Sequence, residues 1–197
     1  MAQPRKLVLA SASKYRRELL ARLGLQFECA APEVDETLHP EESPSATALR
    51  LALLKARAIA PRFPGALIIG SDQVATCGSV RLGKPGDRVT AQRQLAGLSG
   101  RQADFETAVC VLDAANGAVR TRVVPCRVTF RALTPEQIET YVRREQAYDC
   151  AGSAKSEGLG IALIARIDTE DPTSLVGLPL IALTELLAAA GLPVLGL

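Results

Sequence analysis

Residues 7–23 read LVLASASKYRRELLARL, an apolar run that breaks into small hydroxyl residues and two arginines before an amphipathic segment. The pattern predicts a buried strand followed by the start of a helix, where free backbone N–H groups and the macrodipole favour anions. Ser11 and Ser13 add hydroxyl donors, and the paired forks of Arg16 and Arg17 match phosphate oxygens. The stretch therefore predicts a strand-to-helix phosphate site, although a serine-capped helix with two solvated arginines accounts for it about equally well.

The composition narrows the class of protein. The chain has 197 residues, of which 48% are hydrophobic, so it can bury a core as one domain or as one domain with a lobe. Its 23 basic and 21 acidic side chains nearly cancel, which disfavours a nucleic-acid-coating surface and a polybasic membrane tail. The first apolar run is too short for a signal peptide, and charges interrupt every candidate membrane span. We therefore expect a cytoplasmic protein that binds a small molecule, neither nucleic acid nor membrane.

Cysteine and histidine usage excludes several kinds of site. The five cysteines are scattered and form no C-x-x-C pair, so neither a disulfide framework nor a zinc site is expected. His39 is the only histidine and lies beside Pro40 in a polar stretch. A Ser-His-Asp or Cys-His mechanism would need this one loop residue as its base, which argues against both.

Hydrophobic patterning predicts alternating strands and helices. Strands are expected at 27–31, 67–70, 108–112, 120–124, 127–130 and 161–164, and helices at 44–58, 90–98, from 134 and at 180–190. Asn116-Gly117 predicts a hairpin, so the middle of the sheet is expected to be antiparallel. No linker rich in Pro, Gly or Ser divides the chain. We therefore expect a single α/β domain over residues 1–197.

Cations, carboxylates and small donors recur at the expected strand ends and turns. Asp72 follows the strand at 67–70 and Glu33 follows the strand at 27–31, and ligands of open α/β sheets sit at such ends. Magnesium takes one or two carboxylates together with phosphates and waters, so Glu33 and Asp72 are the natural candidates for its ligands. Asp72 is also placed to take the proton of a metal-bound water. As alternatives, Asp72 is a turn or cap residue and Lys84 an exposed turn lysine.

Five motifs, in order along nearly the whole chain, resemble the Maf family of nucleoside triphosphate pyrophosphatases. They lie at residues 9–17, 32–36, 70–74, 83–85 and 151–158. The resemblance implies hydrolysis of a nucleoside triphosphate to the monophosphate and pyrophosphate, with a divalent cation such as Mg²⁺ or Mn²⁺, in a cytoplasmic homodimer. It also implies an α/β fold related to the inosine triphosphate pyrophosphatases, with an elongated mixed sheet, flanking helices and a cleft between two lobes.

The resemblance assigns roles to named residues. Asp72 would be the proton acceptor and a metal ligand, and Glu33 the second ligand. The phosphates would be bound by Ser11, Ser13, Arg16, Arg17, Lys84 and Lys155.

Three positions bear on the substrate. Tyr15, Gln73 and Glu157 resemble the branch of the family that acts on 7-methyl-GTP, whereas Arg, Thr and Gln are typical of the dTTP and UTP branch. A cationic 7-methylguanine ring would gain roughly 0.5–2 kcal/mol from an aromatic face such as Tyr15. Glu157 would accept from the N1 and exocyclic amine of the base, and Gln73 would read another edge. The alternatives are a dTTP/UTP pyrophosphatase of the same family and a non-catalytic nucleotide-binding regulator of cell division.

Three departures from the family pattern accompany these matches. Lys14 stands where Pro is usual, Tyr15 replaces the more typical Trp, and residues 105–108 depart from a Tyr-Thr-Gly pattern. The last of these bears on local substrate contacts and leaves the phosphate site unchanged.

Overall fold

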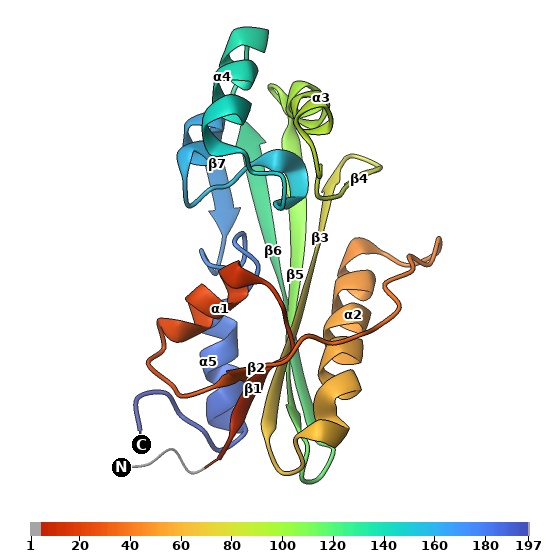
Figure 1. The fold of residues 1–197 in the computed structure, drawn as a ribbon, viewed down its shortest axis with the longest axis vertical. Coiled ribbons are helices and arrows are strands. Elements are labelled where there is room, and N and C mark those ends of the chain that lie inside the picture. The colour runs from red at the N-terminus through yellow and green to blue at the C-terminus, as the bar shows by residue number, and fades with distance from the viewer. Residues whose placement is uncertain (1–4, 197) are drawn as a thin grey trace. The chain divides into compact units, whose positions relative to one another are not determined.

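The computed structural model describes residues 5–196 (Figure 1). The expected lack of a signal peptide rests in part on Met1–Pro4, which lie outside the described residues. The elements in chain order are β1 (Leu7–Leu9), α1 (Lys14–Ala21), β2 (Glu28–Cys29), α2 (Pro44–Ile59), η1 (Ala60–Arg62), β3 (Leu67–Cys77), β4 (Val80–Leu82), α3 (Arg88–Leu98), β5 (Gln102–Asp113), β6 (Val119–Phe130), α4 (Pro135–Glu145), η2 (Ala151–Ser153), η3 (Leu159–Leu163), β7 (Ile164–Thr169) and α5 (Leu180–Ala189).

The strands form one mixed sheet of seven strands. Its order is β2-β1-β3-β5-β6-β7, and β4 pairs with β3. β1 runs parallel to both β2 and β3, whereas the β3–β4 and β6–β7 pairs are antiparallel. The expected hairpin joins β5 to β6, and it is closed by the N–H of Asp113 donating to the carbonyl of Ala118 at 2.8 Å. The predicted α/β fold class, a mixed sheet flanked by helices, is confirmed.

Helices cover both faces of the sheet where β3 and β5 lie side by side. Successive strand residues point to opposite faces. Ile69 and Val109 belong to the buried cluster that includes α1 and α5. Gly70 and Cys110 face α2 instead: the Cys110 thiol lies 3.4 Å from the carbonyl oxygen of Ala52, and that oxygen would be 2.1 Å from a Cβ at Gly70. α1 and α5 therefore pack on one face and α2 on the other (Figure 1).

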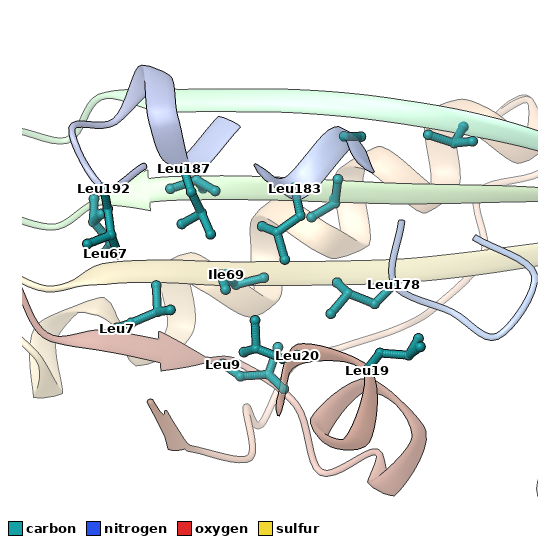
Figure 2. Close-up of a cluster of buried hydrophobic side chains, with 14 residues drawn as sticks. Leu7, Leu9, Leu19, Leu20, Leu67, Ile69, Leu178, Leu183, Leu187 and Leu192 are labelled. Carbon is teal, nitrogen blue, oxygen red and sulfur yellow. The ribbon is translucent and has the colours of Figure 1, made fainter. Parts of the chain in front are cut away.

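The buried cluster explains why the N-terminal strand and helix form. Figure 2 shows leucines of β1, α1, β3 and α5 meeting in one layer. Its members are Leu7, Leu9, Leu19, Leu20, Leu67, Ile69, Val109, Val111, Val124, Leu178, Ala182, Leu183, Leu187 and Leu192. Each fully buried side chain of this size contributes about 1.5–3 kcal/mol, so the cluster fixes the strand-to-helix turn that carries Ser11.

The chain divides into two compact units. Unit 1 comprises 1–73, 106–124 and 171–197, and unit 2 comprises 74–105 and 125–170. β3, β5 and β6 each contribute residues to both units. The expectation of a single domain with two lobes over residues 1–197, and of a cleft between them, stays a prediction.

Several predicted strands differ from the observed elements. The strand expected at 27–31 is only Glu28–Cys29, and those expected at 120–124 and 127–130 are parts of one strand, β6. The strand at 67–70 continues to Cys77, because β4 pairs with its second half. Asp72 therefore lies within β3 and not at its end. The strand that ends beside it is β1, whose last residue, Leu9, pairs with Ile69. The strand predicted at 161–164 is the 3-10 helix η3, and β7 begins only at Ile164. The chain folds back there so closely that a Cβ at Gly160 would lie 2.4 Å from the carbonyl oxygen of Lys155.

Helix caps agree with the sequence. Ser43 caps α2 with Pro44 following it, and Thr134 forms the predicted capping box with Gln137.

In the part of the chain from 5 to 196, no helix is long and apolar enough to cross a membrane.

Candidate functional site

The turn after β1 uses its two serines as hydrogen-bond acceptors. Ser11 is buried, and its hydroxyl oxygen accepts from the backbone N–H of Ser13 at 3.1 Å. Ser13 is the N-cap of α1, where its hydroxyl oxygen accepts from the N–H of Arg16 at 3.4 Å. Because both hydroxyls accept in these bonds, each keeps its O–H proton available for a phosphate oxygen.

Arg16 and Arg17 differ in their environments. Arg16 is half-buried, and its Nε donates to the carbonyl oxygen of Gly177 at 2.8 Å. Burial lowers the pKa of Arg16, an effect that the charges of Asp72 and Glu36 oppose. Arg17 is exposed, one helix position further round. Arg16 therefore has a fixed guanidinium near two carboxylates, whereas Arg17 lies at the surface.

Asp72 is held by a buried lysine that the sequence analysis did not single out. Lys55 Nζ lies 2.5 Å from Asp72 Oδ1 and 2.9 Å from a carboxylate oxygen of Glu36. The side chains of Lys55 and Asp72 are only 9% and 11% exposed, and charges so buried require partners. The signal was present, since Lys55 shares the buried face of α2 with Leu51 and Ile59. A lysine in that apolar pattern predicts a buried partner.

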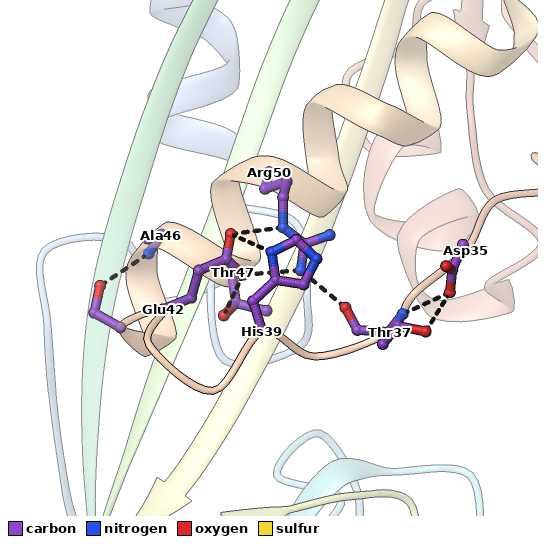
Figure 3. A network of polar contacts seen from close by, with 8 residues as sticks. Asp35, Thr37, His39, Glu42, Ala46, Thr47 and Arg50 are labelled. Atoms are coloured by element: carbon purple, nitrogen blue, oxygen red, sulfur yellow. Dashed lines mark hydrogen bonds and ion pairs between the residues drawn. The ribbon is translucent and has the colours of Figure 1, made fainter.

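The loop from β2 to α2, which carries Glu33 and Glu36, is tied to α2 by a polar network (Figure 3). Glu42 accepts from Arg50 through both carboxylate oxygens, at 2.7 and 2.8 Å, and this pairing is the main cause of its lowered pKa. Arg50 also donates to the carbonyl oxygen of Thr37 at 3.1 Å. Figure 3 places His39 over the same carboxylate, with its Nδ1 3.7 Å away. The network holds the loop in the region where Glu36 reaches Lys55.

The loop between β7 and α5, residues 171–179, supports the site from the other face of the sheet. Asp171 is 1% exposed, and its carboxylate accepts from the N–H groups of Ile181 and Ala182, which caps α5. Gly177 has a φ of 115°, a positive value that glycine adopts more easily than other residues. Its carbonyl oxygen accepts hydrogen bonds from Arg16 and Ser71. The loop thus links the C-terminal helix to the guanidinium of Arg16.

Gln73 points to this second face, away from Asp72. Its amide nitrogen donates to Thr107 and to the carbonyl oxygens of Ser174 and Leu175. Tyr15 is half-buried, and the ammonium of Lys14 lies 4.8 Å from the centroid of its ring. The ring therefore already accepts a cation on its face.

In unit 2, Lys155 is positioned by α4. Its Nζ lies 3.1 Å from Glu145 Oε1, and its backbone N–H donates to the hydroxyl of Tyr141 at 3.0 Å. Glu145 Oε2 accepts from the N–H of Leu159 at 2.6 Å. Burial would raise the pKa of Glu145, but this N–H and the Lys155 ammonium lower it. Glu145 therefore clamps the loop that carries Lys155 and the exposed Glu157.

We expect Glu145→Ala to loosen this loop. The change removes the acceptor of the Leu159 N–H and of the Lys155 ammonium, so about 1–3 kcal/mol of local stability is lost. For the phosphate role that the family resemblance implies for Lys155, KM for a nucleoside triphosphate is expected to rise about tenfold, as steady-state kinetics would measure. Arg144→Ala removes an exposed neighbour on α4 and is the control. Equal KM values for the two variants would show that the clamp does not position Lys155.

The predicted site residues fall in two groups. Unit 1 holds Ser11, Ser13, Tyr15, Arg16, Arg17, Glu33, Asp72 and Gln73, and unit 2 holds Lys84, Lys155 and Glu157. In the first group, hydrogen bonds link Ser11 to Ser13 and Ser13 to Arg16. Asp72 is paired with Lys55. Glu33 and Lys84 are exposed, and neither makes a hydrogen bond or ion pair with another described residue. The phosphate, metal and specificity roles of these residues stay predictions.

The carboxylates of unit 1 suit a hard divalent cation. Asp72 and Glu36 converge on one ammonium, so two sets of oxygen donors lie around a single positive charge. Within residues 5–196, no group of three or more His, Cys, Asp or Glu side chains could hold a metal by itself. Magnesium does not need such a group, because it keeps waters and shares substrate phosphates. Asp72 with waters and phosphate oxygens fits this pattern, and the metal role of Asp72 and Glu33 stays a prediction.

Comparison with known proteins gives the family. Three relatives carry the name 7-methyl-GTP pyrophosphatase: those of Burkholderia pseudomallei, 55% identical over 98% of this chain and 91% of the relative; Thiobacillus denitrificans, 59% over 96% and 94%; and Nitrosococcus oceani, 54% over 98% and 96%. A HAM1 protein structure from Coxiella burnetii aligns at a TM-score of 0.46 and 18% identity over 81% of this chain and 98% of that chain, a likeness too weak to support an inference. The family model described as "Maf-like protein" matches residues 6–190, and this chain belongs to the Maf family.

Proposed function

We propose that this protein hydrolyses 7-methyl-GTP to 7-methyl-GMP and pyrophosphate. The observation that carries the proposal is the shared name of relatives that are 54–59% identical over nearly the whole chain. The site is consistent with it, since fixed cations and a buried carboxylate lie together beside a serine-lined turn. This hydrolysis would remove the modified nucleotide from the nucleotide pool of the cell.

The geometry around Asp72 suits a proton acceptor. Oδ1 is occupied by Lys55, and Oδ2 makes no hydrogen bond with another described residue. A water that attacks the α-phosphorus can therefore give its proton to Oδ2. The P–O bond to the β-phosphate then breaks, and negative charge grows on the leaving pyrophosphate. Arg16 and Lys55 supply the positive charge that stabilises it.

A divalent cation would complete this site. When bound, Mg²⁺ or Mn²⁺ lowers the pKa of its water and neutralises phosphate charge. We propose Asp72 and Glu33 as its protein ligands. Lys84 and Lys155, together with Ser11, Ser13 and Arg17, would bind the remaining phosphate oxygens.

The base would be read by Tyr15, Gln73 and Glu157. A methylated, cationic guanine ring can stack on Tyr15 in the way that the Lys14 ammonium lies over its ring. Glu157 is exposed, and a carboxylate accepts the paired donors of guanine. A pyrimidine offers no comparable pair.

The test is pyrophosphate release from 7-methyl-GTP, GTP, dTTP, UTP and CTP, with magnesium, manganese or a chelator. We expect selective turnover of 7-methyl-GTP that the chelator abolishes. Turnover of dTTP and UTP instead would make this a pyrimidine-directed member of the family. Binding without turnover under every metal would favour a regulatory role. The homodimer and the cytoplasmic location implied by the family resemblance also stay predictions.

A further inference from the structure

The side-chain amide of Gln73 is bound on one side only. Its nitrogen lies 2.9 Å from Thr107 Oγ1, 2.9 Å from the carbonyl oxygen of Ser174 and 3.1 Å from that of Leu175. Its oxygen makes no hydrogen bond with another residue in the described part of the chain. Gln73 is half-buried, whereas Thr107 and Ser174 are fully buried. The amide therefore has a fixed inner end and a free outer end.

The chemistry of the three acceptors fixes which end is inner. Backbone carbonyl oxygens can only accept hydrogen bonds, so the NH₂ group must face Ser174 and Leu175. The hydroxyl of Thr107 gives its own proton to the carbonyl oxygen of Ser174 at 3.0 Å. Its oxygen is then left to accept from Gln73. A flipped amide would place its own carbonyl oxygen against the carbonyl oxygens of Ser174 and Leu175 and lose the hydrogen bond to each.

We infer that Thr107 is a positioning residue that fixes Gln73 as a pure hydrogen-bond acceptor toward the substrate. The inference rests on the proposed function, because it assumes that a nucleotide reaches Gln73. An outward carbonyl oxygen selects a donor and rejects an acceptor at the same place. Gln73 then recognises either a base N–H or amino group or a sugar hydroxyl. It does not recognise a base carbonyl.

Substrate analogues that lack one donor each distinguish these sources. The set is 7-methyl-GTP, its analogue without the 2-amino group, its N1-methylated analogue, and the 2′-deoxy and 3′-deoxy forms. For the native protein we expect kcat/KM to fall about tenfold for the one analogue whose missing donor faces Gln73. If kcat/KM falls for a base analogue, Gln73 binds the base. If it falls for a deoxy form, Gln73 binds the sugar.

Thr107→Val and Thr107→Ser test the positioning. Valine has nearly the shape of threonine but neither accepts from Gln73 nor donates to Ser174. The Ser174 and Leu175 carbonyls still keep the NH₂ group inward, so the side chain shifts without turning over and its outward oxygen moves away from the donor. We expect the valine variant to lose the tenfold discrimination and the serine variant to keep it. A change in stability alone would lower activity on all substrates and leave their ratio unchanged, so the ratio is the decisive readout.

The outcomes separate this inference from the proposed function. If the native protein hydrolyses 7-methyl-GTP but the valine variant keeps the same ratio, the positioning role is wrong and the proposed function stands. If no analogue is discriminated, Gln73 does not read a donor. If the native protein hydrolyses no triphosphate, both the function and the inference fail.

Discussion

Asp72→Asn is expected to retain the fold and to lose turnover by about 10³-fold, within the range that general bases contribute. The asparagine oxygen can still accept from Lys55, so the buried ammonium keeps a hydrogen bond at this position. What disappears is the carboxylate oxygen that would take the proton of the attacking water. Initial rates of pyrophosphate release and circular dichroism of the same preparation measure the two properties.

Glu36→Gln is the matched control for Asp72→Asn. It also neutralises a carboxylate in contact with Lys55, but Glu36 is 57% exposed and Asp72 only 11%. We expect less than a tenfold change in kcat for this variant. A folded Asp72→Asn protein with native turnover would remove Asp72 from the mechanism. Equal losses in both variants would mean that the charge around Lys55 matters more than the proton acceptor.

Gly70→Ala is expected to destabilise the protein by about 3 kcal/mol or more. A Cβ at this position would lie 2.1 Å from the carbonyl oxygen of Ala52, 2.9 Å from the Cys110 sulfur and 3.0 Å from the Cβ of Ala56. The nearest of these atoms belongs to the backbone of α2, so no side-chain rotation relieves the clash. For a chain of this size the melting temperature should fall by roughly 6–12 °C.

The same substitution should also reduce activity, because α2 would be pushed away from β3. α2 carries Lys55 and β3 carries Asp72, so their 2.5 Å contact would lengthen. Gly97→Ala is the control, since Gly97 lies inside α3 with nothing within 4 Å of a Cβ. That change should be neutral or stabilise the helix by up to about 1 kcal/mol. A native melting temperature for Gly70→Ala would show that α2 adapts without cost.

Local sequence patterns predicted most of the elements. The caps at Ser43 and Thr134 each depend on a few neighbouring residues, and both were confirmed. The hairpin at Asn116-Gly117 is equally local. The predicted length of β3 was wrong. The second half of this strand pairs with β4, and its polar residues interrupt the apolar run from which a strand is predicted.

The partners of the site residues could not be predicted in the same way. Lys55 and Asp72 are 17 residues apart, and Arg16 and Gly177 are 161 residues apart. No periodic pattern encodes which distant carbonyl or carboxylate will meet a given side chain. Of these residues, only Lys55 is marked by the local sequence, because it is a lysine on the apolar face of its helix.

Asp72 and Gln73 are adjacent residues of β3, and their side chains point to opposite faces of the sheet. Asp72 meets Lys55 on the side of α2, and Gln73 meets Thr107 and Ser174 on the side of α5. Substitutions at Gln73 and Thr107 therefore leave the surroundings of Asp72 intact. A library randomised at these two positions can be selected for new nucleotides while hydrolysis is retained, which makes β3 a suitable starting point for engineering altered specificity.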